Sequence, residues 1–206
     1  MAATPSRHRA CLELACIEKA NAILPCLACG TQGMVMISFD IDSMPCQDLI
    51  EADMMAKIVR VESSGNPYAI GVVGGRLQRQ PVDLQEAVRT ADYLEKAGYN
   101  YSIGLSQVNR VHFKQLAWNG DVQKGFDVCQ NLRAGARIYS RCKESAARSL
   151  KTSDAISVSR AALSCYYSGN FVTGEKHGYV DKVLAGAAPA KVGVSRAVSV
   201  SKSMFD

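Results

Sequence analysis

The sequence predicts an all-α, mainly helical protein with one compact domain over about residues 44–185. Apolar residues recur at steps of three and four in several segments of this region, as they do in amphipathic helices. We find no alternating series of apolar and polar residues long enough to build a sheet. The 206 residues, 48% of them hydrophobic and 21% charged, supply enough apolar side chains for one sizeable core.

The first helix is expected over about residues 45–63, with Glu62 near its C-terminal end. The apolar positions that recur along it are Leu49, Ile50, Met54, Met55, Ile58, Val59 and Val61. The next segment, 64–81, is rich in glycine and holds two prolines, so it predicts an ordered loop. Within it, AIGVVGG (69–75) is a candidate for a small hairpin. The domain is thus expected to carry a glycine-rich loop or a small hairpin after its first core helix.

A second helix is expected over about residues 83–97, because Asp83 is placed to cap its start and Gly98 to end it. Its inner face would carry Ala87, Val88, Ala91 and Leu94. Three more helices are expected over about residues 128–150, 154–167 and 178–184. The segment between the second and third helices, YNYSIGLSQVN, is too short and mixed for a long helix.

The two ends of the chain show no regular helical pattern. Residues 1–43 are interpreted as an N-terminal extension, either an irregular leader or translated sequence upstream of a start at Met34 or Met36. A secretory signal is not expected, since three charged residues interrupt the segment after the basic cluster at residues 7–9: Glu13, Glu18 and Lys19. Residues 186–206 are rich in Ala, Gly, Ser and Val with scattered lysines, which predicts a flexible tail.

The charge pattern argues against nucleic acid as a partner, and the lengths of the apolar stretches argue against a membrane. The net charge of +5 and the isoelectric point near 8.8 are mild, and basic residues are scattered, so nucleic-acid binding is not expected. No stretch reaches the roughly 18 to 20 apolar residues of a membrane-spanning helix, so stable membrane insertion is not expected. A weakly basic surface is compatible with an anionic polymer such as a bacterial cell wall.

Eight cysteines fall into two groups. The first group, within the first thirty residues, has spacings that allow a zinc site, although the surrounding segment lacks turn residues: Cys11, Cys16, Cys26 and Cys29. The second group is better placed for disulfides, whose pairing the sequence does not choose: Cys46, Cys129, Cys142 and Cys165. Of these, Cys129 and Cys165 most resemble structural cysteines, and Cys46 is a candidate partner for either.

Glu62 stands where the first helix gives way to the loop, and no second carboxylate follows before Asp83. A carboxyl group at the end of a buried helix suits a general acid, because partial desolvation raises its pKa and keeps it protonated near neutral pH. The alternative is a solvated surface glutamate, which spacing alone favours, since most glutamates are exposed.

Four short strings follow one another along the chain: ESSGNPYAIG (62–71), GLSQVN (104–109), YYSGN (166–170) and GYVDKV (178–183). Two longer ones overlap them, AIGVVGGRLQRQP and SCYYSGNF. Their order and spacing resemble those of soluble lytic transglycosylases of the goose-lysozyme-like superfamily, and more specifically the Vir-type subgroup of type IV secretion and conjugation systems. The resemblance covers about residues 44–184 and implies a lysozyme-like fold.

The resemblance implies a role for several residues. Glu62 matches the catalytic acid, and five residues match substrate-binding positions: Ser63, Gln107, Asn109, Tyr166 and Tyr179. Each has a plainer alternative, since the two amides could satisfy a turn and the two tyrosines could belong to the core. The sequence departs from the superfamily at Ser106, where methionine is usual, and at Tyr167, where asparagine is frequent.

The function implied by the resemblance is a peptidoglycan lytic transglycosylase that cuts the β-1,4 bond between N-acetylmuramic acid and N-acetylglucosamine. Such an enzyme forms 1,6-anhydromuramic acid and needs no metal or organic cofactor. Its implied partners are peptidoglycan strands and components of a type IV secretion or conjugation apparatus, and its implied location is the periplasm. Two alternatives stay open: a muramidase that hydrolyses the same bond, and a non-catalytic peptidoglycan-binding scaffold.

Overall fold

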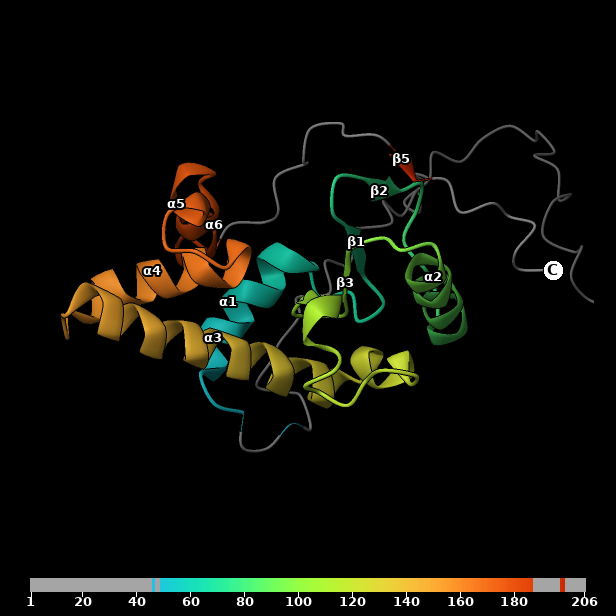
Figure 1. Ribbon diagram of the computed structural model, residues 1–206, viewed down its shortest axis with the longest axis horizontal. Coiled ribbons are helices and arrows are strands. Elements are labelled where there is room, and N and C mark those ends of the chain that lie inside the picture. The colour runs from blue at the N-terminus through green and yellow to red at the C-terminus, as the bar shows by residue number, and fades with distance from the viewer. Residues whose placement is uncertain (1–45, 47–48, 187–196, 199–206) are drawn as a thin grey trace, which may run out of the picture. The chain divides into compact units, whose positions relative to one another are not determined.

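The computed structural model describes residues 46, 49–186 and 197–198 of the chain (Figure 1). The α-helices of the described part are α1 (Ala52–Glu62), α2 (Leu84–Lys96), α3 (Val128–Leu150), α4 (Ala155–Ser168), α5 (Thr173–Lys176) and α6 (Tyr179–Leu184). Its strands are β1 (Ile70–Val72), β2 (Arg76–Leu77), β3 (Tyr101–Ile103), β4 (Val108–Asn109) and β5 (Ala197–Val198). Two 3-10 helices complete it, η1 (Arg110–His112) and η2 (Val122–Phe126). The predicted extension 1–43, with its candidate zinc site, lies outside the described residues.

The helices confirm the mainly helical class and most of the predicted elements. Asp83, Asp127 and Asp154 cap α2, α3 and α4, each accepting a 2.8 Å hydrogen bond from the backbone N–H three residues on. Gly98 and Gly178 adopt φ of 76° and 67°, which suit glycine after α2 and before α6. The short helix α5 was not predicted, because four residues are too few for a periodic pattern. Among the described residues, no helix has both the length and the apolar character needed to cross a membrane.

The predicted start of the first helix is wrong, because α1 begins at Ala52 and not near residue 45. Glu51 adopts the left-handed conformation, with φ of 57°, and a residue in that conformation does not continue a right-handed helix. The Glu51 carboxylate instead pairs with Lys143 of α3 at 2.6 Å. Further back, Cys46 is buried and joined by a disulfide to Cys129 of α3. These two links hold Cys46 and Glu51 against α3.

A small antiparallel sheet was not expected from the sequence. Its strand order is β1-β3-β4, with Ile70 opposite Ile103 and Ser102 opposite Asn109. The glycine-rich segment is therefore a loop and not a hairpin of its own, since β1 pairs with β3 and β2 pairs in parallel with β5. Strands of two or three residues are too short for alternation to reveal them.

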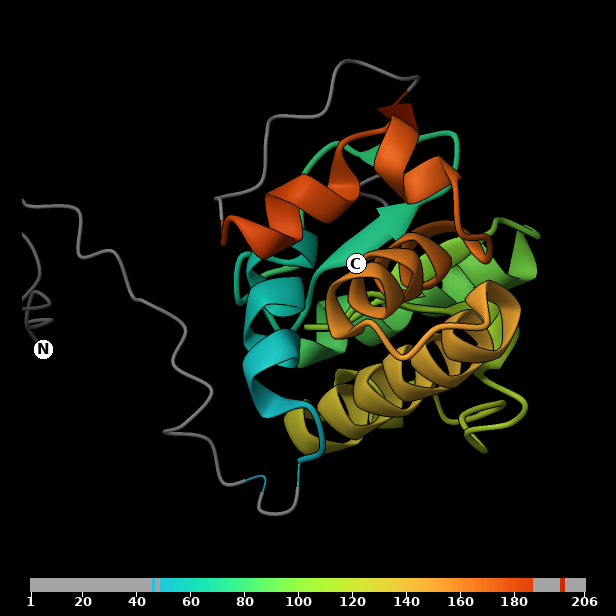
Figure 2. The ribbon, with the colours of Figure 1, turned by 90° about the vertical axis from the view of Figure 1, so that its left-hand side faces the viewer.

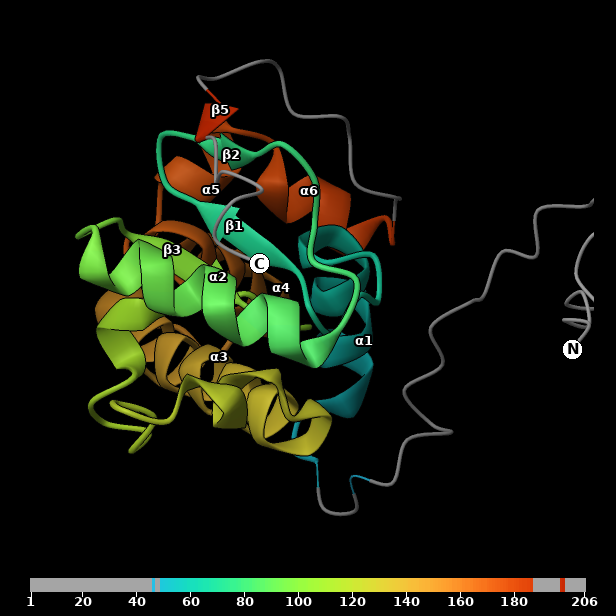
Figure 3. The same cartoon turned by 90° about the vertical axis from the view of Figure 1, so that its right-hand side faces the viewer.

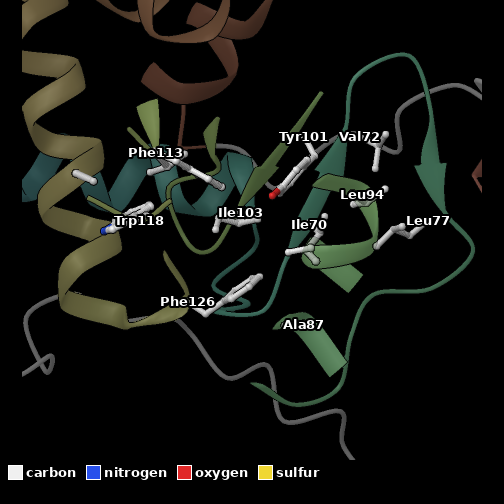
Figure 4. Packing of buried hydrophobic residues seen from close by; sticks show 13 residues of the cluster. Ile70, Val72, Leu77, Ala87, Leu94, Tyr101, Ile103, Phe113, Trp118 and Phe126 are labelled. Atoms are coloured by element: carbon white, nitrogen blue, oxygen red, sulfur yellow. The ribbon is translucent and has the colours of Figure 1, made fainter. Parts of the chain in front are cut away.

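Two large buried clusters of side chains organise the described residues, and Figures 2 and 3 show the ribbons of the elements that carry them. One lies between the sheet, α2 and the segment up to η2, and includes the residues labelled in Figure 4: Ile70, Val72, Leu77, Ala87, Leu94, Tyr101, Ile103, Phe113, Trp118 and Phe126. The other joins α1, α3, α4 and α6 through Met55, Ile58, Ala136, Tyr139, Leu163 and Val180. Figures 1 and 2 show α4 between α3 on one side and α5 and α6 on the other. The helix α1 ends at Glu62, where it leads into the loop toward β1.

Two disulfides hold the helical layer. Cys46–Cys129 closes a sequence separation of 83 residues, and its sulfurs lie in a buried cluster with Val59 and Leu132. Cys142–Cys165 joins the middle of α3 to α4 across a separation of 23 residues. A cross-link over a long separation stabilises the fold chiefly by restricting the unfolded chain.

Asn131 of α3 fixes the turn between β3 and β4. Its side chain accepts a hydrogen bond from Ser106 N at 2.7 Å and donates to the carbonyls of Ile103 and Gly125 at 2.9 and 2.8 Å. Gly104 approaches so closely that an added Cβ would lie 2.2 Å from the Asn131 Nδ2 atom. Asn131 is 1% exposed, so water cannot easily take over its hydrogen bonds to the three backbone groups.

Replacing Asn131 with alanine is expected to lower the free energy of unfolding by about 2 to 4 kcal/mol, since it leaves three buried backbone groups unpaired. Denaturant unfolding followed by circular dichroism measures the change. Exposed Asn119→Ala is the matched control, with an expected effect within about 0.5 kcal/mol. Equal stability of the two variants would contradict this role for Asn131.

Candidate active site

Glu62 is the last residue of α1, about one turn after the buried side chains of Ile58 and Val59. The helix stops there because Ser63, at its C-cap, turns back on the last turn. Both Ser63 N and Ser63 Oγ donate to the Val59 carbonyl, at 3.0 and 3.1 Å, and Ser63 Oγ accepts from Gly65 N at 3.2 Å. The described contacts of the predicted substrate residue Ser63 therefore shape the helix end and leave Glu62 at its edge.

Tyr179, the first residue of α6, reaches Glu62 across 117 residues of sequence. Its hydroxyl donates a hydrogen bond to Glu62 Oε1 at 2.7 Å, and the residue is 5% exposed. Burial raises the pKa of Glu62 from 4.5 to about 7, and the hydrogen bond from Tyr179 opposes part of that rise. Glu62 is thus a carboxyl group whose protonated and ionised forms are both populated near neutral pH.

Tyr166 of α4 is the third member of this group. Its hydroxyl donates to the Ser106 carbonyl at 2.7 Å, which ties α4 to the turn between β3 and β4. Burial raises the pKa of Tyr166 well above its usual value, and the negative charge of Glu62 raises it further. Tyr166 therefore remains a neutral phenol beside the acid.

Ser106 acts in this turn through its backbone. Its N–H is held by Asn131 and its carbonyl by Tyr166. The side chain is fully buried, and its Oγ is a buried polar atom of the described residues without a hydrogen-bond partner. It packs against Gly135 of α3, where an added Cβ would lie 2.6 Å from Ser106 Cβ. The small serine thus lets the turn approach α3 closely.

Gln107 and Asn109 are held by the protein itself. Gln107 adopts φ of 46° and donates through Nε2 to the carbonyls of Ala69 and Gly104 at 3.0 and 2.9 Å. Asn109 donates to Ser102 Oγ at 3.2 Å and caps η1 by accepting from Val111 N at 3.1 Å. The structure thus brings Glu62, Tyr166 and Tyr179 together, and the described hydrogen bonds of the two amides fix the loop and the sheet.

Sequence reasoning missed the residue that anchors α5 and α6. Arg160 of α4 donates to both carboxylate oxygens of Glu175 at 2.9 and 2.7 Å, and to Asp181 Oδ1 at 2.8 Å. Helices of four and six residues are marginal on their own, so this fork helps to hold Tyr179 in place. The three residues lie 6 to 21 positions apart, which no local pattern reveals.

The glycine-rich loop is fixed by another residue whose role the sequence did not reveal, Gln80. Its Oε1 accepts from Ile70 N at 2.7 Å and its Nε2 donates to the Ile70 carbonyl at 3.0 Å, as a neighbouring strand would. Beside it, Arg79 pairs with the buried Glu86, which also accepts from Val82 N at 2.9 Å. The pairing with Arg79 lowers the pKa of Glu86, so this carboxylate stays ionised and holds the end of the loop.

Two other features of the described region lie apart from these residues. A surface pocket of about 340 Å³ lies between α2 and the segment from Arg110 to Val122, and none of the predicted site residues lines it. In the part of the chain that the structure describes, no group of three or more His, Cys, Asp or Glu side chains is arranged to hold a metal ion.

The comparison with known families gives the transglycosylase SLT domain over residues 41–183. The chain belongs to this family. Type IV secretion system protein virB1 of Brucella abortus is 43% identical over 157 residues, which cover 74% of this chain and 65% of that protein. Protein virB1 of Rhizobium radiobacter is 30% identical over 152 residues, which cover 72% of this chain and 60% of that protein.

A third relative, protein virB1 of Agrobacterium fabrum, is 27% identical over 164 residues, which cover 79% of this chain and 64% of that protein. The chain therefore spans less than two thirds of the length of these relatives. No solved structure matches it significantly. The family match covers Glu62 and its tyrosine partners.

Replacing Glu62 with glutamine is expected to stabilise this SLT domain at high pH. A carboxyl group whose pKa rises from 4.5 to about 7 on folding stabilises the fold below its unfolded pKa, and this contribution is lost as the pH rises to about 7. At pH 8 the variant should exceed the wild type by about 2 to 3 kcal/mol in free energy of unfolding, with little difference at pH 4.

Denaturant unfolding at both pH values measures this difference. The surface variant Glu144→Gln is the matched control for removing one negative charge from the protein. If the difference in free energy of unfolding between Glu62→Gln and the wild type stays the same from pH 4 to pH 8, burial does not raise the pKa of Glu62.

Proposed function

We propose that this chain is a peptidoglycan lytic transglycosylase that cleaves the β-1,4 bond between N-acetylmuramic acid and N-acetylglucosamine and forms 1,6-anhydromuramic acid. The observation that carries the proposal is the partly buried Glu62 carboxyl, with its pKa near 7 and its hydrogen bond from Tyr179. The membership of the SLT family supports the same reaction. The catalytic module is the segment 44–185.

In the first step, protonated Glu62 is the general acid. Its proton goes to the glycosidic oxygen as the bond from that oxygen to the muramic C1 breaks, and an oxocarbenium-like centre develops at C1. A pKa close to the working pH makes such a transfer efficient, because the protonated form is populated and the proton is still readily donated. Tyr179 keeps its own proton, since burial raises its pKa well above the usual value.

In the second step, ionised Glu62 is the general base. It takes the proton from the muramic 6-hydroxyl as the oxygen of that group bonds to C1, so the carboxyl group regains its proton. The N-acetyl group of the substrate and the neutral phenols of Tyr166 and Tyr179 surround the charged centre. The glycan loses one bond and gains one bond, and no water is consumed.

The surroundings of Glu62 favour this reaction over hydrolysis. Glycosidases normally flank the scissile bond with two carboxylates. In the described part of the chain, Tyr179 donates a hydrogen bond to Glu62 and Tyr166 lies close enough to feel its charge, whereas no second carboxylate shifts the pKa of Glu62. A single acid that also serves as base suits an internal hydroxyl nucleophile that the substrate itself supplies.

The names of the relatives suggest where this cleavage is used. One is a type IV secretion system protein, so we infer that the chain opens peptidoglycan locally for the assembly of a type IV secretion or conjugation apparatus. Its partners would be glycan strands and components of that apparatus, and its location would be the periplasm. The other substrate-binding residues of this proposal are Ser63, Gln107 and Asn109, with no metal or organic cofactor.

The test is digestion of purified sacculi in water enriched in the heavy oxygen isotope. The wild type should release fragments with 1,6-anhydromuramic ends, one water lighter than reducing ends and free of the isotope. Glu62→Gln should lower the rate of release at least about 100-fold, because glutamine neither donates nor accepts the proton. Dye release gives the rate and mass spectrometry gives the ends.

Each alternative has its own result in this test. Labelled reducing ends from the wild type would indicate a hydrolytic muramidase. Binding to sacculi without turnover by the wild type would indicate a scaffold. The variant Glu144→Gln should retain the wild-type rate, since this side chain lies on the surface of α3.

A further inference from the structure

Tyr167 stacks directly on the tyrosine that holds Glu62. The rings of Tyr167 and Tyr179 have centroids 4.6 Å apart and an interplanar angle of 24°. On its far side, the Tyr167 hydroxyl lies 3.2 Å from Nδ1 of His177, whose ring meets the tyrosine edge-on at 5.8 Å. A continuous series of contacts thus runs from His177 through Tyr167 and Tyr179 to Glu62.

The backbone around Tyr179 does not by itself fix the Tyr179 side chain, so contacts from other side chains are needed to hold it. Tyr179 opens a helix of only six residues, after Gly178 with φ of 67°, and no side chain caps that helix. The hydroxyl must nevertheless stay 2.7 Å from Glu62 Oε1. A hydrogen bond needs a short donor–acceptor distance, so a swing of the phenol about the Cα–Cβ bond of Tyr179 would carry the hydroxyl away from Glu62 and break it.

The position of Tyr167 is not explained by the core. Its side chain is 45% exposed on the last turn of α4, while Leu163 one turn earlier is fully buried. Most aromatic side chains find their stability by burial, but this one uses a ring face for Tyr179 and its hydroxyl for His177. Its described contacts therefore point to Tyr179 and the segment before it.

We propose that Tyr167 is a positioning residue for the Glu62 acid, acting through Tyr179. Its ring holds the Tyr179 ring at the orientation in which the hydroxyl meets Glu62, and His177 fixes Tyr167 in turn. This inference rests on the proposed function, since it concerns the same acid. A stacked aromatic pair of this kind favours one ring orientation over another by roughly 2- to 12-fold, and this factor sets the size of the expected effect on kcat.

A double-mutant cycle on the release of anhydro fragments tests the proposal. Tyr167→Ala should lower kcat about 3- to 10-fold with little change in KM, because the orientation of Tyr179 relaxes. In the Tyr179→Phe background, the same change should have no further effect on kcat, since no hydroxyl remains to be placed. Tyr167→Phe should retain at least half of the wild-type kcat, because it keeps the stacked ring.

The control is Tyr99→Ala, which removes another partly exposed tyrosine and should leave kcat unchanged. Equal losses from Tyr167→Ala in both backgrounds would overturn the proposal, since a general structural role does not depend on the Tyr179 hydroxyl. A rise in KM at constant kcat would also overturn it and would indicate that the exposed ring binds sugar directly. If Tyr167→Ala unfolds at the assay temperature, Tyr167→Leu takes its place in the cycle.

The proposal can fail independently of the proposed function. Anhydro fragments from the wild type and their loss in Glu62→Gln establish the reaction without reference to Tyr167. In an enzyme that passes that test, a wild-type kcat for Tyr167→Ala contradicts the positioning role alone.

Discussion

The hydrogen bond from Tyr179 to Glu62 sets the main constraint on this fold, because it joins the end of α1 to the start of α6. Residues 117 positions apart must meet within 2.7 Å. The buried stripe of α1 fixes one side, and Arg160 secures the short helices that carry the other. Tyr166 then ties α4 to the turn between β3 and β4. Much of the described structure thus serves to place one carboxyl group.

Burial gives that carboxyl group its chemistry. Desolvation disfavours the ionised form, while the phenol of Tyr179 stabilises it, and the balance leaves the pKa of Glu62 near 7. A group poised there can donate a proton in one step and accept one in the next without a second carboxylate. The buried carboxyl group also lowers the stability of the fold at high pH, a cost that functional sites often carry. Stability and reactivity therefore depend on the same desolvation.

The parts that the sequence predicted are those with local signals. The cap at Asp83, the stop at Gly98 and helical periodicity located α2, and periodicity located α3, α4 and α6. The motif resemblance named both Glu62 and Tyr179, which a hydrogen bond joins. The sheet was missed because β1 pairs with β3 some thirty residues away, and because all three strands are too short for a pattern. Asn131, Gln80 and Tyr167 were missed for a related reason, since each acts through contacts that depend on the folded chain. The early start predicted for α1 failed because periodicity does not reveal the left-handed Glu51.

The proposed chemistry depends most on the protonation of Glu62, which an NMR titration measures directly. Protein labelled at the glutamate side-chain carboxyl carbon would be followed from acid to alkaline pH, with Glu62→Gln used to assign the resonance. The titration of Glu62 is expected to have its midpoint at about 7. A midpoint near the ordinary value of 4.5 would contradict the proposed chemistry, because the carboxyl group would then be ionised at neutral pH and unable to act as the acid.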